Sequence, residues 1–416
     1  MTFEPKKNQQ KLFASNSLYL YLSYFADYFL AIIFLPLIAR AIGAVELGIV
    51  GIVQGYGLFI ALFMEFGSPL VATREVSRLK NKQMDLLNFI GGIFSIKIAL
   101  IPVVCFISLI FIVNVPILNK NWSYLIIVIV GSIAQGLSPL WYFLGKSNMK
   151  IISISKIVFR SLGFLVIFFY VQSSSDGWIV LGALCLSSIF ISLFLIFALI
   201  REVGLFKIKF SKKTKEIFLK SNLSFIITII PILYQNLCVI ILSITVSPFQ
   251  LGLYYGANRI YRAFNSLYGP LSQTFFPIIS SIEQKEKKIA LSATKKYILS
   301  LTVLGILLFL FIFFKSDFII SLILGNEFSQ SKEILMVFGL VLPLTAISNS
   351  IGRQWLMFLN KDFFYAFSQF LSSIAAFISF LILIRMYGVF AMPISLIVYE
   401  SISIILISLY LKKLND

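Results

Sequence analysis

Long apolar runs, separated by short polar segments, follow one another along the whole chain. Each run is near or above the ~20 residues that a helix needs to cross the hydrocarbon layer of a membrane, so the pattern predicts twelve spanning helices. The longest segment between two runs, 201–220, is basic and separates six predicted spans from six. The predicted spans are Leu12–Ala39, Leu47–Val71, Phe89–Val113, Trp122–Leu144, Ile151–Val171, Trp178–Ile200, Leu223–Val246, Leu251–Ile282, Tyr297–Phe314, Ile334–Leu359, Phe363–Ile384 and Val389–Leu411.

The composition excludes a soluble globular protein. Of the 416 residues, 59% are hydrophobic and only 12% are charged, which is more apolar surface than a soluble domain can bury. We therefore predict an all-α polytopic membrane protein in three parts. Residues 1–200 and 221–416 each hold six spans, and residues 201–220 form a basic cytoplasmic linker.

The formal net charge of +18 has a topological explanation. If the N-terminus lies in the cytoplasm, most lysines and arginines fall in segments on that side of the membrane. This asymmetry follows the positive-inside rule, so it predicts that both termini are cytoplasmic and argues against nucleic-acid binding. The densest basic segments are Lys6–Lys11, Arg74–Lys82, 201–220, Lys285–Lys296 and Lys412–Lys413.

The run Leu251–Ile282 is interrupted by polar residues at steps of three and four, which a helix aligns in one stripe. Arg259 and Arg262 lie one turn apart in it, and two arginines are too costly to face lipid. We expect them to face a water-filled cavity and to bind an anionic headgroup bidentately, with an interfacial amphipathic helix as the alternative. The stripe consists of Tyr255, Asn258, Arg259, Arg262, Asn265, Ser266, Gly269 and Gln273.

Three further cations fall within predicted spans. Arg160 and Arg353 are expected to support the two arginines of the stripe. For Lys97, snorkelling of the ammonium group to the cytoplasmic surface is the alternative to a functional position in the core.

Three carboxylates, Asp27, Glu65 and Glu400, also fall within predicted spans. Intramembrane carboxylates often act as relays, so these are candidates for coupling transport to H⁺ or Na⁺. The alternative is structural, with Asp27 and Glu65 locking helices together by pairing with arginines. Histidine is absent and the three cysteines lie far apart, so neither a metal site nor a cofactor is expected.

Two motifs carry a family resemblance. One runs from Glu46–Val50 through Phe66–Gly67 to Ala72–Arg78, whose last part reads Ala-Thr-Arg-Glu-Val-Ser-Arg; the other comprises Gln250–Tyr254 and Ala257–Arg259. Both resemble the polysaccharide-transporter family, to which Wzx-type O-antigen flippases belong.

The resemblance implies the fold of the multidrug/oligosaccharidyl-lipid/polysaccharide exporter superfamily, with two six-helix bundles around a central cavity. It also implies an oligosaccharide repeat unit on undecaprenyl diphosphate as substrate. Related lipid II flippases place arginines on both span two and span eight, whereas the matching region of span two here offers Gln54.

We therefore predict a flippase, not an enzyme, that carries this lipid from the cytoplasmic to the periplasmic leaflet of a bacterial inner membrane by alternating access. Arg259 and Arg262 would bind the diphosphate, and Asn258, Asn265 and Gln54 would add polar contacts. Membrane lipids, a polysaccharide polymerase and a chain-length regulator are the expected partners. A multidrug or small-molecule exporter and a membrane polysaccharide polymerase or ligase are the alternative functions.

Overall fold

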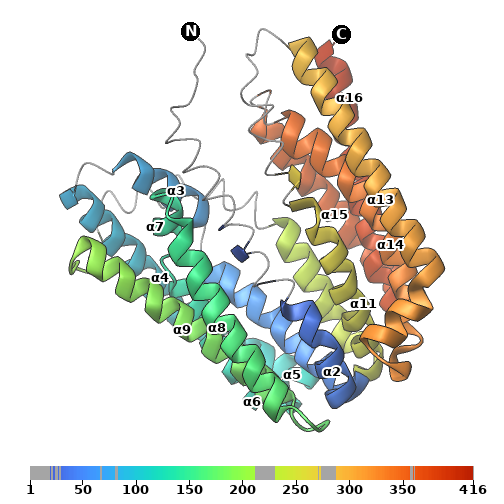
Figure 1. Ribbon diagram of the computed structural model, residues 1–416, viewed down its shortest axis with the longest axis horizontal. Coiled ribbons are helices and arrows are strands. Elements are labelled where there is room, and N and C mark those ends of the chain that lie inside the picture. The colour runs from blue at the N-terminus through green and yellow to red at the C-terminus, as the bar shows by residue number, and fades with distance from the viewer. Residues whose placement is uncertain are drawn as a thin grey trace. The chain divides into compact units, whose positions relative to one another are not determined.

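The computed structural model describes helices joined by short connections (Figure 1). Contacts group the chain into two compact units. The first unit comprises Met1–Phe34 and Val53–Ile226, and the second comprises Leu35–Ile52 and Ile227–Asp416. The described residues are 19, 22–23, 27, 30–65, 68–79, 83–210, 230–269, 271–272, 287–356, 359 and 361–415.

Among the described residues, eight stretches are long and apolar enough to cross a membrane, which confirms a multi-pass helical membrane protein. One of them, Phe363–Lys413, contains the last two predicted spans in succession. The helix Ile230–Thr245 is apolar but shorter. The count of twelve spans and their grouping as two six-helix bundles around a central cavity stay predictions.

The first unit contains the C-terminal part of the long helix α2, from Val53 on, and the helices α3 to α9. The predicted span Trp122–Leu144 is broken at Ser138, because the proline that follows keeps this residue in an extended conformation. The predicted span Leu47–Val71 is too long, since α2 ends at Glu65. The helices are α2 (Leu30–Glu65), α3 (Ser68–Arg78), α4 (Gln83–Asn114), α5 (Pro116–Lys120), α6 (Trp122–Leu137), α7 (Leu140–Gly145), α8 (Met149–Tyr170) and α9 (Gly177–Val203).

The motif Ala72–Arg78 forms most of the short helix α3, which packs against α7. Val76 joins Trp141 and Tyr142 in a buried cluster, and the Cα of Gly145 lies so close to Val76 that an added Cβ would meet its side chain at 2.7 Å. The motif Ala72–Arg78 therefore forms an apolar contact between the short helices α3 and α7.

The connection after α9 begins at Gly204, whose φ of 83° suits glycine, and runs as irregular chain to residue 210. A Cβ added to Gly91 of α4 would lie only 2.0 Å from the carbonyl oxygen of Lys207 in this connection. Gly91 thus provides room for the backbone of the basic linker. The rest of this linker, 211–220, lies outside the described residues, and the predicted domain boundary stays a prediction.

In the second unit, α14 packs against α11, α13 and α16, and α15 pairs with α16. α11 begins with a capping box in which Ser247 and Gln250 satisfy each other's backbone N–H groups, followed by Pro248 in the first turn. The helices after Ile230–Thr245 are α11 (Pro248–Ser266), α13 (Lys287–Ile323), η3 (Asn326–Phe328), α14 (Ser331–Asn349), η4 (Ser350–Leu356), α15 (Asp362–Tyr387), η5 (Gly388–Phe390) and α16 (Ala391–Asn415).

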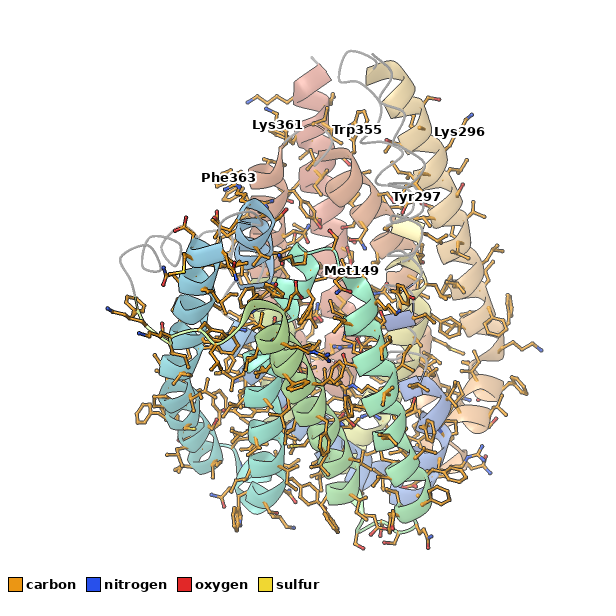
Figure 2. All side chains as sticks on the ribbon, turned by 60° about the vertical axis from the view of Figure 1, so that its left-hand side comes forward. Met149, Lys296, Tyr297, Trp355, Lys361 and Phe363 are labelled. Atoms are coloured by element: carbon orange, nitrogen blue, oxygen red, sulfur yellow. The ribbon has the colours of Figure 1, made fainter. Side chains whose placement is uncertain are left out.

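Basic residues gather at one end of the second unit. The start of α13, the start of α15 and the C-terminal end of α16 lie together there (Figure 1). Lys296, Lys361 and the neighbouring Trp355 and Phe363 mark the same end in Figure 2.

The helix α2 is interrupted at Gly43, which has φ 74° and ψ 176°. The Glu327 carboxylate accepts a hydrogen bond from the backbone N–H of Ala44, 3.0 Å away. The Arg40 guanidinium donates to the carbonyl oxygen of Leu322 at 2.7 Å, in the last turn of α13. An acid on a helix N-terminus and a base on a helix C-terminus both complement the helix dipole, so the two contacts fix this bend to the second unit.

Glycine lets α2 and α11 touch through their backbones. A Cβ added to Gly48 would lie 2.2 Å from the Pro248 carbonyl oxygen, and one added to Gly252 would lie 1.8 Å from the Ala44 carbonyl oxygen. The two similar triplets of the sequence, Glu46-Leu47-Gly48 and Gln250-Leu251-Gly252, therefore pack against each other.

Replacing Gly252 by alanine should destabilise the protein, because the new methyl group has to push two helix backbones apart. We expect a loss of about 1–3 kcal/mol, measured as a lower unfolding temperature of the purified protein in detergent. Gly182→Ala is the matched control, since an added Cβ there meets nothing within 4 Å. An equal effect of the two substitutions would contradict the close approach.

Candidate functional site

The predicted stripe of polar residues lies on α11 from Tyr255 to Ser266, while Gly269 and Gln273 come after this helix, and exposure changes along it. Tyr255 and Asn258 are buried, with exposed fractions of 8% and 6%, Arg259 is half-buried and Arg262 is exposed. The Tyr255 ring covers Gly51 of α2, where a Cβ would approach the ring to 2.3 Å. The side chains of this stripe are thus buried at Tyr255 and exposed at Arg262.

The two arginines of α11 lie within each other's electrostatic field, and both act on the Tyr255 hydroxyl. Among the described residues, no ion pair joins Arg262 to a carboxylate. Asn265, one turn further, is half-buried, and its side-chain oxygen is inaccessible to solvent. This face of α11 therefore offers guanidinium donors beside an amide and a phenol, which is a set suited to an anion.

The other predicted substrate residues are placed less completely. Gln54 is half-buried on α2, in the first unit. Arg353 belongs to the π-helical segment η4 that follows α14, and its side chain lies outside the described residues, as does all of Gln273. The roles of Gln54 and Arg353 in binding substrate therefore stay predictions.

Arg160 lies in the first unit and pairs with Asp27. Lys156, one turn earlier on α8, contacts the Asp27 carboxylate at 2.5 Å between Nζ and Oδ2, while the Arg160 Nε lies 3.9 Å from Oδ1. The three side chains are about one-quarter exposed. For Asp27 the structural alternative, pairing with an arginine, is found, and Lys156 is the nearer partner; the coupling role of Asp27 stays a prediction.

Glu65 and Lys97 form a second charged neighbourhood in the first unit. The Glu65 carboxylate interacts electrostatically with Lys97 and, less strongly, with Lys156. Lys97 is only 2% exposed, and its ammonium group donates to the Gly136 carbonyl oxygen at 2.5 Å. Snorkelling of Lys97 to the membrane surface is therefore wrong, because its side chain ends against the α6 backbone.

Glu400 lies in a hydroxyl-rich neighbourhood of the second unit, on α16. It is 9% exposed, and the Thr345 hydroxyl of α14 donates to its Oε1 at 2.9 Å. One turn further, Gln369 of α15 donates to the Ser403 hydroxyl at 2.7 Å and accepts from the Tyr399 hydroxyl. Polar side chains thus connect three helices inside the second unit.

Sequence reasoning missed Lys97 and Lys156 as members of these groups. The sequence could have indicated Lys156, since it lies one helical turn before Arg160. For Lys97 the sequence offers two outcomes, and only the packing of α4 against α6 decides between them.

Glu65 and Lys97 should stabilise the fold together. We expect Lys97→Met and Glu65→Gln each to lower the unfolding temperature, and the double variant to lose less than their sum, with a coupling of about 0.5–3 kcal/mol. The same cycle on the exposed pair Arg78–Glu75, 3.1 Å apart, is the control and should give no more than about 0.5 kcal/mol. Additive losses at Glu65 and Lys97 would show that their charges are independent.

The chain is similar over most of its length to known transporters. Two curated proteins, each named "Putative O-antigen transporter", are 27% identical over 363 residues in Escherichia coli K12 and 25% identical over 406 residues in Shigella dysenteriae. These matches cover 84% and 96% of this chain, and 85% and 98% of the relatives.

Two solved structures have a similar fold. The lipid II flippase MurJ, in an inward closed conformation, matches with a TM-score of 0.72 at 16% identity, over 95% of this chain and 87% of its own. An inward-facing multidrug resistance MATE family transporter of the MOP superfamily matches with a TM-score of 0.64 at 12% identity, over 91% and 93%. These relatives are transporters and not enzymes. Residues 13–283 match the family described as polysaccharide biosynthesis protein, and the chain belongs to that family, as the motifs predicted.

Proposed function

We propose that this protein is a flippase for a lipid-linked intermediate of polysaccharide synthesis. Three findings support the proposal: the family to which the chain belongs, the name of its relatives as O-antigen transporters, and a fold shared with a lipid II flippase. The observation that carries it is the pair Arg259 and Arg262, one turn apart on a helix among apolar spanning segments.

The substrate that suits this pair is an oligosaccharide repeat unit on undecaprenyl diphosphate. A guanidinium group binds phosphate oxygens bidentately, and two such groups match the two phosphates of a diphosphate. Asn258 and Asn265 on the same helix can donate to the first sugar. The polyprenyl tail remains in the lipid, since it needs no polar partner.

The proposed direction is from the cytoplasmic to the periplasmic leaflet of a bacterial inner membrane. The basic residues at one end of the second unit, including Lys296 and Lys361, support a cytoplasmic position for that end and for the C-terminus. Transport by alternating access needs two states of the same substrate site. The flipped lipid would then pass to a polymerase and a chain-length regulator.

Of the three carboxylates, Glu400 is the best candidate for coupling. Asp27 is already engaged by two cations, whereas the hydrogen-bond donor described at Glu400 is the neutral hydroxyl of Thr345. A buried carboxylate among hydroxyl groups can take up a proton or a Na⁺ ion and release it when the packing around it changes.

Removing both arginines of α11 should abolish transport. For Arg259→Ala combined with Arg262→Ala we expect a loss of roughly 100-fold or more in surface polysaccharide, because each charge-assisted contact to the diphosphate is lost. Complementation of a strain that lacks its own flippase gives the measurement, with the amount of protein in the membrane recorded alongside.

The lysine pair Arg259→Lys with Arg262→Lys keeps the charge but not the bidentate geometry, so an intermediate loss is expected. Arg385→Ala is the control, since this residue is exposed at the end of α15. Normal polysaccharide in the double alanine variant, at normal protein levels, would refute the assignment of the diphosphate site.

Neutralising Glu400 should uncouple transport from the ion gradient. We expect an imposed H⁺ or Na⁺ gradient to accelerate flipping of a fluorescent lipid-linked sugar by the wild-type protein in vesicles, and Glu400→Gln to be insensitive to it. Asp176→Asn, at a half-buried carboxylate just before α9, should respond like the wild type. Coupling through Glu400 fails if wild-type transport ignores both gradients or if the glutamine variant still responds.

A further inference from the structure

The Asp27 carboxylate lies against two cations but does not satisfy all of their hydrogen-bond donors. It lies against two cations of one helix, with Lys156 at 2.5 Å and Arg160 at 3.9 Å. A distance of 3.9 Å is too long for a hydrogen bond, and the buried Nε of Arg160 has no hydrogen-bond acceptor among the residues that the structure describes. One donor of the guanidinium group therefore remains unsatisfied beside the carboxylate.

The charges around this contact favour a second anion. Lys156 also interacts with Glu65, which interacts with Lys97. Among these five groups, the three cations Lys97, Lys156 and Arg160 exceed the two carboxylates by one charge. The ammonium and guanidinium groups together present more donors than one carboxylate can accept, whereas a phosphate or diphosphate offers further oxygens and more negative charge.

The three charged side chains of this site are accessible to solvent. Asp27, Lys156 and Arg160 are 28%, 21% and 22% exposed, so an external anion can reach them. Two further described contacts involve α8: Ser153 donates a hydrogen bond to the Tyr19 carbonyl oxygen, and Phe34 of α2 stacks on Phe164.

We propose that the Asp27 carboxylate takes the place of a substrate phosphate group when no substrate is bound. In the empty protein its carboxylate neutralises Lys156 and Arg160, and a phosphate group of the lipid carrier displaces it on binding. The inference rests on the proposed function, and it adds a place on the first unit that receives the same diphosphate lipid at some stage of its passage.

The exchange can be measured with the purified full-length protein in nanodiscs, using farnesyl diphosphate and inorganic pyrophosphate as probes. Asp27→Asn removes the competing carboxylate, so both probes should bind about tenfold more tightly than to the wild type. Lys156→Gln with Arg160→Gln should weaken binding by about tenfold. Asp27→Ser is measured in parallel, in case the asparagine variant does not fold.

Asp317→Asn is the matched control, because it removes a carboxylate from a lysine, Lys332, at 3.2 Å in an exposed pair. It should leave the affinity for both probes unchanged. If the wild type binds the diphosphates and the folded Asp27 variants bind them equally or more weakly, Asp27 only locks two segments together and the inference is wrong. If the wild type binds neither probe, the proposed function itself fails.

Discussion

A charge in the hydrocarbon layer has no water around it, so the protein has to provide its solvation, and this constraint shapes the interior of both units. Three solutions occur. Lys156 and Arg160 share a carboxylate, Lys97 uses a backbone carbonyl oxygen, and Glu400 uses a hydroxyl group. The α11 arginines differ, since their helix passes from a buried phenol to an exposed guanidinium within two turns.

These solutions have different consequences for movement. A carboxylate between two cations can be replaced only by another anion, whereas a carboxylate that accepts from a hydroxyl can change its charge with little rearrangement of its neighbours. The first arrangement suits the recognition of a charged lipid. The second suits an ion that drives the cycle. The Asp27 arrangement lies in the first unit and Glu400 in the second, so the two arrangements share no side chains.

The sequence predicts most of this architecture, because apolar runs determine where helices form. The predicted spans Ile151–Val171 and Trp178–Ile200 agree closely with α8 and α9, and the predicted polar stripe lies on α11 as expected. The break at Ser138 was not predicted, although the proline that follows it in the sequence could have indicated it. Local pattern therefore accounts for most of the helices but was not used for this break.

Long-range contacts could not be predicted in the same way. Nothing near Gly48 in the sequence shows that its neighbour in space is the Pro248 carbonyl oxygen, although the two similar triplets marked both places. The position of the Lys97 ammonium group depends on how α4 packs against α6. The pairing of Asp27 with α8 depends on the packing of two segments that are 129 residues apart in the sequence. Such choices are made by packing, which a single sequence does not encode in any local pattern.

The bend of α2 at Gly43 has a consequence for the order in which the protein is synthesised and folds. The carboxylate that caps the Ala44 N–H belongs to Glu327, 283 residues later in the chain. At the usual pace of translation this partner leaves the ribosome roughly 15–60 s after Ala44. The bend therefore cannot acquire its final contacts while the early helices are being inserted, and its completion marks one of the last steps of assembly in the membrane.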